Sequence, residues 1–274
     1  MIPELHKPIE CVILAYHRVN GHRRDPLTVR TTAFREQLAL LLGSGYRNVG
    51  LEELAALVSG TPAGREKVFA ITFDDGYRDG FTDALPVLKE LGCRATFFLV
   101  ADQIGAERPF PWDLGRFASL TRDDFAMDDR EVGELLDAGM SIGSHTCSHP
   151  LLATVDQARA RDEIERSKRV LEGRFGVPVR TFCYPAGSLS DGVVAMVAEA
   201  GYFAGVVTPP VPGIPETIFT LKRVGIYQAT TSARLRLRLH PVLAQARDVL
   251  WSLRWRLGRR ARTSPQGISP GGAP

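Results

Sequence analysis

The sequence contains no run of apolar residues that approaches the roughly 18 needed to cross a membrane as a helix. It also contains no Cys-x-x-Cys pair, and no internal repeats. Three of its four cysteines lie in or beside apolar stretches, so free and buried thiols are expected and nothing requires a disulfide framework. The four are scattered over the chain at Cys11, Cys93, Cys147 and Cys183.

The first residues, MIPELHKPIECVILAYHRV, lack the charged segment, apolar core and small-residue cleavage site of a signal peptide. We therefore expect a cytoplasmic location. Hydrophobic residues make up 44% of the 274 residues and charged residues 24%, which is typical of a soluble globular protein with a sizeable core.

Lysine is absent from the last part of the chain, where residues 231–274 hold nine arginines and one acidic residue, Asp248. The remainder carries 25 basic and 30 acidic residues, so the body is mildly acidic. We expect residues 231–262 to form a basic amphipathic helix and residues 263–274 to be disordered. Such a helix suits an anionic membrane surface, as a peripheral contact at the inner membrane, or docking on the domain or on a partner. Nucleic acid binding is not expected from an acidic body without a recognisable nucleic-acid module.

Near-continuous apolar stretches alternate with helical patterns over residues 1–230, which we take as one domain. This alternation predicts a parallel sheet covered by helices. About seven such units favour a barrel over an open sheet. The expected strands are 11–17, 67–73, 95–100, 179–185 and 202–207, and the expected helices are 32–46, 80–91, 129–139, 156–176 and 191–201.

Two adjacent carboxylates, Asp74 and Asp75, follow the apolar strand in FAITFDDGYRDG (69–80), and Gly76 permits a sharp turn there. The carboxyl ends of parallel strands are where such sheets place their active sites. A structural pair of aspartates would more often lie in an exposed turn.

Two histidines, His145 and His149, stand four residues apart in SIGSHTCSHP (141–150), also after a strand. They can share an ion only if the segment curls like a helical turn, and the spacing alone is a weak signal of metal. Two imidazoles and one carboxylate form an open zinc site. Asp74-Asp75 can supply that carboxylate and leave a second one to take a proton from the water that the ion activates.

Taken together, TFDDG (72–76), SHTCSHP (144–150) and, in part, RTFCYPAG (180–187) resemble the first three motifs of the polysaccharide deacetylases, carbohydrate esterase family 4, with its NodB homology domain. The resemblance covers roughly residues 10–225. ILAYHRV (13–19) and FREQLALLLGSGYRNV (34–49) are also similar to the entry segment of one bacterial subgroup. The family implies an α/β fold, a distorted (β/α)7 barrel, that removes acetyl groups from N-acetylated sugars.

The resemblance also implies roles for individual residues. Asp75, His145 and His149 would bind one divalent ion, with zinc favoured over cobalt, nickel or manganese, and Asp74 would be the general base. The metal and the backbone N–H near Ala186 would stabilise the oxyanion. The substrate would be bound by Tyr184, Pro185, Ala186 and Gly187.

The sequence departs from the family pattern at several positions. Cys183 stands where many members have an arginine that orients the base, and we expect Arg223 to replace it. Ala186 lacks the usual aromatic side chain, which removes a wall of the groove. The late Leu-x-His motif that supplies the general acid is not visible, and we do not assign this role to His240. His17 is a second catalytic candidate, reaching the site from the first strand.

The segment 101–128, which includes ERPFPWDLGRF, interrupts the alternation and is either a binding loop or a packed surface loop. We expect its Trp112 and Asp113 to contact the sugar. The function favoured is metal-dependent N-deacetylation of an N-acetylhexosamine glycan, which can be a polysaccharide, an oligosaccharide or a lipid-linked precursor. The alternatives are a hydrolase of a non-sugar amide, and a glycan-binding member with impaired catalysis.

Overall fold

The computed structural model describes residues 10–60, 66–117, 119–209, 211 and 214–239. The chain divides into two compact units, Met1–Ser232 and Ala233–Pro274. The first contains strands β1 (Glu10–Tyr16), β2 (Arg18–Val19), β3 (Thr28–Val29), β4 (Arg47–Asn48), β5 (Lys67–Phe73), β6 (Thr96–Leu99), β7 (Ser141–Ser144), β8 (Thr181–Cys183), β9 (Ala204–Val207), β10 (Leu221–Lys222) and β11 (Val224–Gly225). Its helices are α1 (Thr31–Gly43), α2 (Leu51–Ser59), α3 (Leu85–Glu90), α4 (Asp129–Asp137), α5 (Gln157–Phe175) and α6 (Asp191–Glu199).

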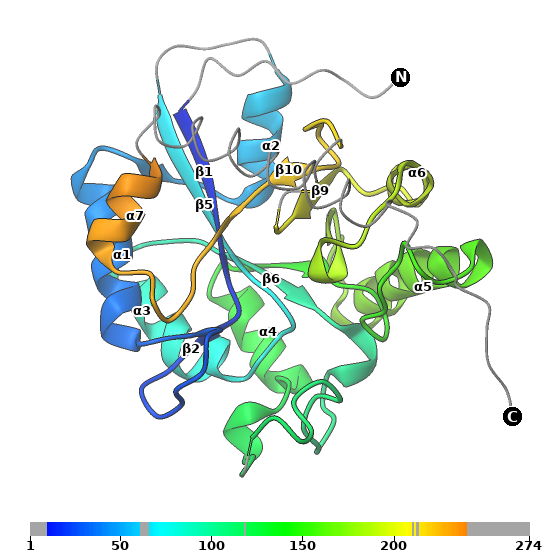
Figure 1. Ribbon diagram of the computed structural model, residues 1–274, viewed down its shortest axis with the longest axis horizontal. Helices are drawn as coiled ribbons and strands as arrows, with labels where there is room; N and C mark the ends of the chain where they lie inside the picture. Colours follow the sequence, from blue (N-terminus) through cyan, green and yellow to red (C-terminus); the bar gives the residue numbers. More distant parts are fainter. Residues whose placement is uncertain (1–9, 61–65, 118, 210, 212–213, 240–274) are drawn as a thin grey trace, which may run out of the picture. The chain divides into compact units, whose positions relative to one another are not determined.

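A parallel sheet with the order β10-β9-β8-β7-β6-β5-β1-β11 forms the centre of the first unit. Figure 1 shows β1 and β5 side by side at this centre, with helices α1 to α6 placed around the strands. The core of these strands is apolar and fully buried, as in β5, where the six residues after Lys67 are all buried. Burial on both faces explains why the strands appear as continuous apolar stretches in the sequence.

The two ends of the sheet belong to one short segment of the chain. Leu221 and Lys222 pair with β9, whereas Val224 and Gly225 pair with Leu14 and Ala15 of β1. Only Arg223 separates β10 from β11. The segment 221–225 therefore joins the first and last positions of the sheet, and the described strands form a distorted (β/α)7 barrel, as predicted.

The barrel is distorted beside β5. The first half of β5 pairs with β4 at Val68 and Phe69, and its second half pairs with β6 at Thr72 and Phe73. β4 and β6 thus occupy different halves of the same edge of β5.

Local signals in the sequence set the ends of the longest helix. Asp156 precedes α5, and its side chain accepts a hydrogen bond from the N–H of Arg159. Gly176 ends the helix with a φ of 67°, a conformation that glycine adopts without strain. The expected helix 156–176 is confirmed.

The second unit is described only at its start, where α7 spans Ser232–Leu239. The rest of the expected basic helix, residues 240–262, and the expected disordered end, residues 263–274, lie outside the described residues. Within the described part of the chain, no helix has the length and apolarity that crossing a bilayer requires.

Candidate active site

The carboxyl ends of the parallel strands bring together most of the residues selected from the sequence. His17 follows β1, Asp74 and Asp75 follow β5, and His145 follows β7. The backbone N–H of Asp74 donates to the carbonyl of Tyr16 over 2.9 Å, which extends the pairing of β1 and β5 by one residue. The chain then turns sharply through Asp75 and Gly76, with φ values of 71° and 83°. The turn expected at Gly76 is therefore present.

Asp75, His145 and His149 form a compact cluster. The Nε2 atoms of both histidines lie 3.5 Å from the same oxygen of Asp75, and the potential ligand atoms of the three residues all lie within 4.8 Å of one another. Ligand atoms about 2.0–2.1 Å from a tetrahedral ion lie about 3.4 Å apart. The two distances to Asp75 match this spacing, so the residues present fit a divalent ion.

The ring of His145 has its orientation fixed by the neighbouring strand. Its Nδ1 lies 2.7 Å from the carbonyl oxygen of Cys183. Since a carbonyl can only accept, Nδ1 must carry a proton and donate it, and Nε2 is the nitrogen that faces Asp75. Metal-ligating histidines are held in this way by a backbone carbonyl or a carboxylate.

His149 is suited to ligation by its charge state. Burial, together with the charge of His145, lowers the pKa of His149 to about 4. Its imidazole is therefore neutral near pH 7, as a metal ligand must be. Trp112 packs on this imidazole with ring centroids 4.4 Å apart.

The curl that joins the two histidines contains two residues with unusual backbone conformations. Thr146 and His149 have φ values of 68° and 64°. The left-handed conformation costs a residue with a side chain about 1–2 kcal/mol. The hydroxyl of Thr146 accepts a hydrogen bond from the N–H of His149 over 2.9 Å, which stabilises the curl from inside.

Arg223 extends to Asp74 from the segment 221–225, the seam at which the barrel closes. Its two terminal nitrogens each donate to one oxygen of the Asp74 carboxylate over 2.6 Å, and it also donates to Thr72 and Thr208. Burial would raise the pKa of Asp74, but the guanidinium outweighs burial and holds this pKa well below its usual value. Asp74 is therefore ionised and fixed in position.

Cys183 lies where Arg223 and Asp74 meet. Its sulfur is 3.1 Å from a terminal nitrogen of Arg223 and 3.6 Å from Asp74. The small side chain of Cys183 leaves room for the guanidinium of Arg223, which comes from the segment between β10 and β11. Asp74, His145 and Cys183 also come close enough to hold an ion, but the positive guanidinium on Asp74 opposes a cation there.

His17 faces the same carboxylate from the first strand. Its Nε2 lies 3.9 Å from an oxygen of Asp74, and its side chain is 19% exposed. His17 and Arg223, the two catalytic candidates named in addition to Asp74, thus both lie beside its carboxylate.

Trp112 and Asp113 have different positions in the insert. The indole N–H of Trp112 donates to the hydroxyl of Tyr77, and that hydroxyl donates to the carboxylate of Asp113 over 2.7 Å. Asp113 is only 2% exposed. Its carboxylate is therefore turned inward, towards Tyr77, and the expected contact of Asp113 with the sugar stays a prediction. Trp112 lies beside the cluster of Asp75, His145 and His149.

The side chains of the YPAG segment (184–187) are mostly buried. Tyr184 is 1% exposed and its hydroxyl donates to the carbonyl of Phe219, so its ring packs in the interior, and its part in substrate binding stays a prediction. Pro185 and Gly187 are buried as well. Ala186 is exposed, with a φ of 50°.

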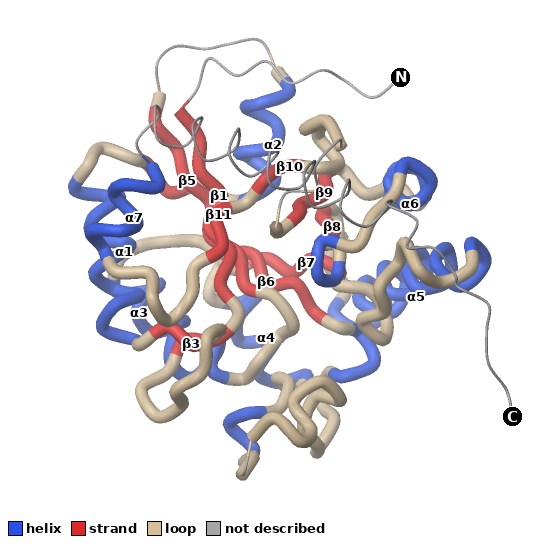
Figure 2. The backbone as a smooth tube through the Cα atoms, viewed as in Figure 1, coloured by secondary structure: helices blue, strands red, loops and turns tan. Residues whose placement is uncertain are grey.

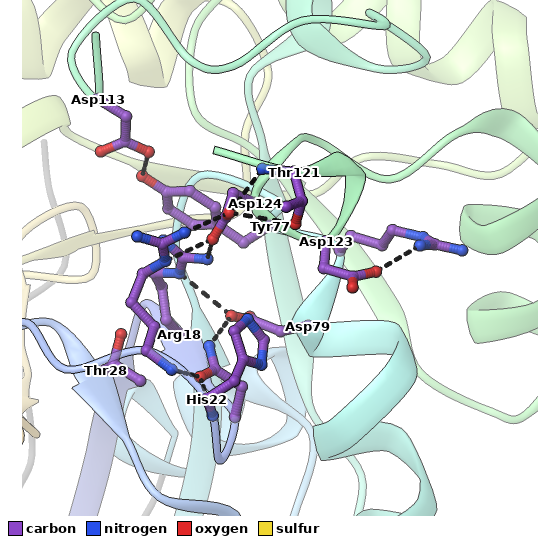
Figure 3. Close-up of polar contacts among 12 residues, drawn as sticks. Arg18, His22, Thr28, Tyr77, Asp79, Asp113, Thr121, Asp123 and Asp124 are labelled. Carbon is purple, nitrogen blue, oxygen red and sulfur yellow. Dashed lines mark hydrogen bonds and ion pairs between the residues drawn. The ribbon is translucent and has the colours of Figure 1, made fainter. Parts of the chain in front are cut away.

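A buried ionic network that the sequence did not reveal supports the insert. Arg18, 1% exposed, donates to Asp79 and to Asp124, and its guanidinium lies 4.6 Å from the ring centre of Tyr77. Figure 3 shows these contacts together with the bond from Tyr77 to Asp113. Burial raises the pKa of Asp79 to about 6 despite the arginine. The network links β2 to the insert and, through Tyr77, to Trp112.

The polysaccharide deacetylase family model matches residues 61–205, more than half of the chain. The YxkH protein of Bacillus subtilis, named as a polysaccharide deacetylase, is 28% identical over 204 residues, which are 74% of this chain and 66% of that protein. A peptidoglycan-N-acetylglucosamine deacetylase of Bacillus cereus is 28% identical over 138 residues, 50% of this chain and 54% of that protein. The chain thus spans between about half and two thirds of these relatives.

Among solved structures, the Streptococcus pyogenes deacetylase PplD in complex with acetate superposes with a TM-score of 0.70. The match covers 87% of this chain and all of that one, at 24% identity. This structural match supports the barrel fold described above.

Proposed function

Because this chain belongs to the polysaccharide deacetylase family, we propose that it hydrolyses the N-acetyl group of N-acetylhexosamine units in a glycan and releases acetate. The observation that carries the proposal is the cluster of Asp75, His145 and His149, which lies beside an ionised carboxylate, Asp74, held by Arg223. An N-acetylglucosamine unit is the substrate named for the Bacillus cereus relative. The chemistry proposed for this chain is the same.

We propose zinc as the ion, with cobalt, nickel or manganese as alternatives, because two imidazoles and one carboxylate are the ligands of open zinc sites. When bound, the ion supplies Lewis acidity that activates a water molecule and polarises the acetamide carbonyl. Asp75, His145 and His149 would hold it.

Asp74 is the proposed general base. It takes the proton of the attacking water while the water oxygen bonds to the acetamide carbon, and Arg223 keeps the carboxylate aimed and holds it ionised until that proton arrives. The negative charge that develops on the carbonyl oxygen needs a donor, and we propose the backbone N–H of Ala186 for this role. Breakage of the C–N bond then requires a proton for the leaving amine.

We propose that His17 supplies that proton, since its imidazole lies beside Asp74 and is partly open to solvent. Replacement of His17 with glutamine is expected to lower turnover about 100-fold, within the range that a positioned acid contributes, and to leave the zinc dissociation constant unchanged. His22→Gln is the matched control, because His22 is an exposed histidine on the loop that follows β2. Equal turnover of the two variants would remove His17 from the mechanism.

The function is tested by measuring acetate released from N-acetylglucosamine oligomers, with the chain stripped of metal and then reloaded with zinc. An N-acetylated amine without a sugar is the comparison substrate. Acetate from the oligomers alone supports the proposal, whereas acetate from the comparison substrate alone would assign the chain to another amide. Oligomer binding without acetate from either substrate would indicate an impaired member of the family.

Two further expectations stay proposals that rest on the sequence. They are a cytoplasmic location and a peripheral membrane contact through residues 231–262. Fractionation of cells, comparing the full chain with one that ends at residue 230, would test both.

A further inference from the structure

The curl between the two histidines is bound by a residue from a distant helix. The backbone N–H groups of Cys147 and Ser148 both donate to one carboxylate oxygen of Glu163, each over 2.9 Å. The hydroxyl of Ser148 donates to the other oxygen. Glu163 is 4% exposed. Its carboxylate thus receives three hydrogen bonds from the two residues that stand midway between the histidines.

Glu163 is itself held firmly. It lies on the buried face of α5 with Ala160, Ile164, Ser167 and Leu171. Figure 2 shows α5 beside the end of β7, the strand that leads into the curl. The hydroxyl of Ser167, one turn further along α5, lies 2.7 Å from the hydroxyl of Ser144 at the end of β7. This contact packs α5 against β7.

The curl needs such support because of its backbone. Thr146 and His149 both have positive φ values, and residues with side chains keep that conformation only where the surroundings enforce it. Glu163 binds the two residues that lie between them. If this contact were lost, the backbone would relax and the two Nε2 atoms would no longer meet at the same oxygen of Asp75.

We propose that Glu163 is a positioning residue that sets the affinity of the Asp75, His145 and His149 cluster for a divalent ion. The inference rests on the proposed function, since it concerns the same cluster. The physical basis is that hydrogen-bond partners outside the ligand set commonly change metal affinity by 10–100-fold when they are removed.

The experiment measures the zinc dissociation constant of the full chain by competition with a chromophoric chelator. Glu163→Asp keeps the charge but withdraws the carboxylate from Cys147 and Ser148, and it is expected to raise the dissociation constant by about 10–100-fold. Glu163→Gln keeps the length, and its amide oxygen can still accept both N–H groups. We expect its dissociation constant to stay close to that of the unaltered chain.

Ser167→Ala is the matched control for stability. It removes a buried hydrogen bond from the same face of α5 but none from Cys147 or Ser148. We expect a lower thermal midpoint of the metal-free protein and an unchanged dissociation constant for zinc. If Glu163→Asp does not fold, Ser148→Ala removes one of the three bonds from the curl itself and is expected to give a smaller rise.

The outcomes separate this inference from the proposed function. An unaltered chain that binds zinc, with Glu163→Asp and Ser148→Ala binding it equally well, overturns the role of Glu163 and leaves the proposed function intact. An unaltered chain that binds no zinc overturns the metal cluster and this inference with it. A rise that occurs equally in Ser167→Ala would show that Glu163 acts only through general stability, which also overturns the proposal.

Discussion

Replacement of Asp74 with asparagine is expected to lower the rate of acetate release by about 1,000-fold, within the range that a positioned general base contributes. The amide has the shape of the carboxylate but cannot take a proton from water at neutral pH. Asp75, His145 and His149 are untouched, so the variant should bind zinc like the unaltered chain. The measurement is turnover of zinc-loaded protein on N-acetylglucosamine oligomers, together with the zinc dissociation constant.

Asp79→Asn is the matched control for this experiment. Asp79 is also a buried carboxylate bound to an arginine, Arg18, but it is not one of the proposed metal ligands. Loss of stability is expected in both variants, and loss of turnover only at Asp74. Acetate release by Asp74→Asn at the rate of the unaltered chain would show that another group is the base.

Replacement of Arg223 with alanine is expected to destabilise the protein by about 3–5 kcal/mol, because it leaves the buried charge of Asp74 without its partner. For a domain of this size, such a loss lowers the thermal midpoint by about 10 °C. Turnover should fall as well, since Asp74 loses the two bonds that aim it. Thermal denaturation and acetate release measure the two effects.

The double variant Arg223→Ala with Asp74→Asn isolates the cause. Removal of the carboxylate charge also removes the need for its partner, so the double variant should be more stable than Arg223→Ala alone. Equal or lower stability of the double variant would mean that Arg223 stabilises the seam through its contacts with Thr72 and Thr208 instead.

The long elements of the barrel were predictable because they repeat a simple pattern. The strand expected at 67–73 is β5, and the helix expected at 191–201 is α6, Asp191–Glu199. The helix α2 and the two-residue strands β2, β3, β4, β10 and β11 were missed. Two residues carry no periodicity, and such strands form only where another strand offers a free edge.

The candidate site was predictable where neighbours in sequence act together. The pairs Asp74-Asp75 and His145–His149 can each be recognised within a short stretch of sequence. The position of Arg223 depends on closure of the barrel, which no local pattern encodes. Glu163 was hidden in a helix rich in charges, although its spacing from Ala160, Ile164 and Ser167 places it on the apolar face.

Closure of the sheet by the segment 221–225 has a consequence for biosynthesis. The partners Leu14 and Val224 are separated by most of the polypeptide, so a nascent chain exposes the free edges of β1 and β9 until the ribosome has released this segment. Unpaired edges of this kind promote association between chains. During that interval the carboxylate of Asp74 also lacks its counterion, so translation must pass Arg223 before the catalytic base is in place.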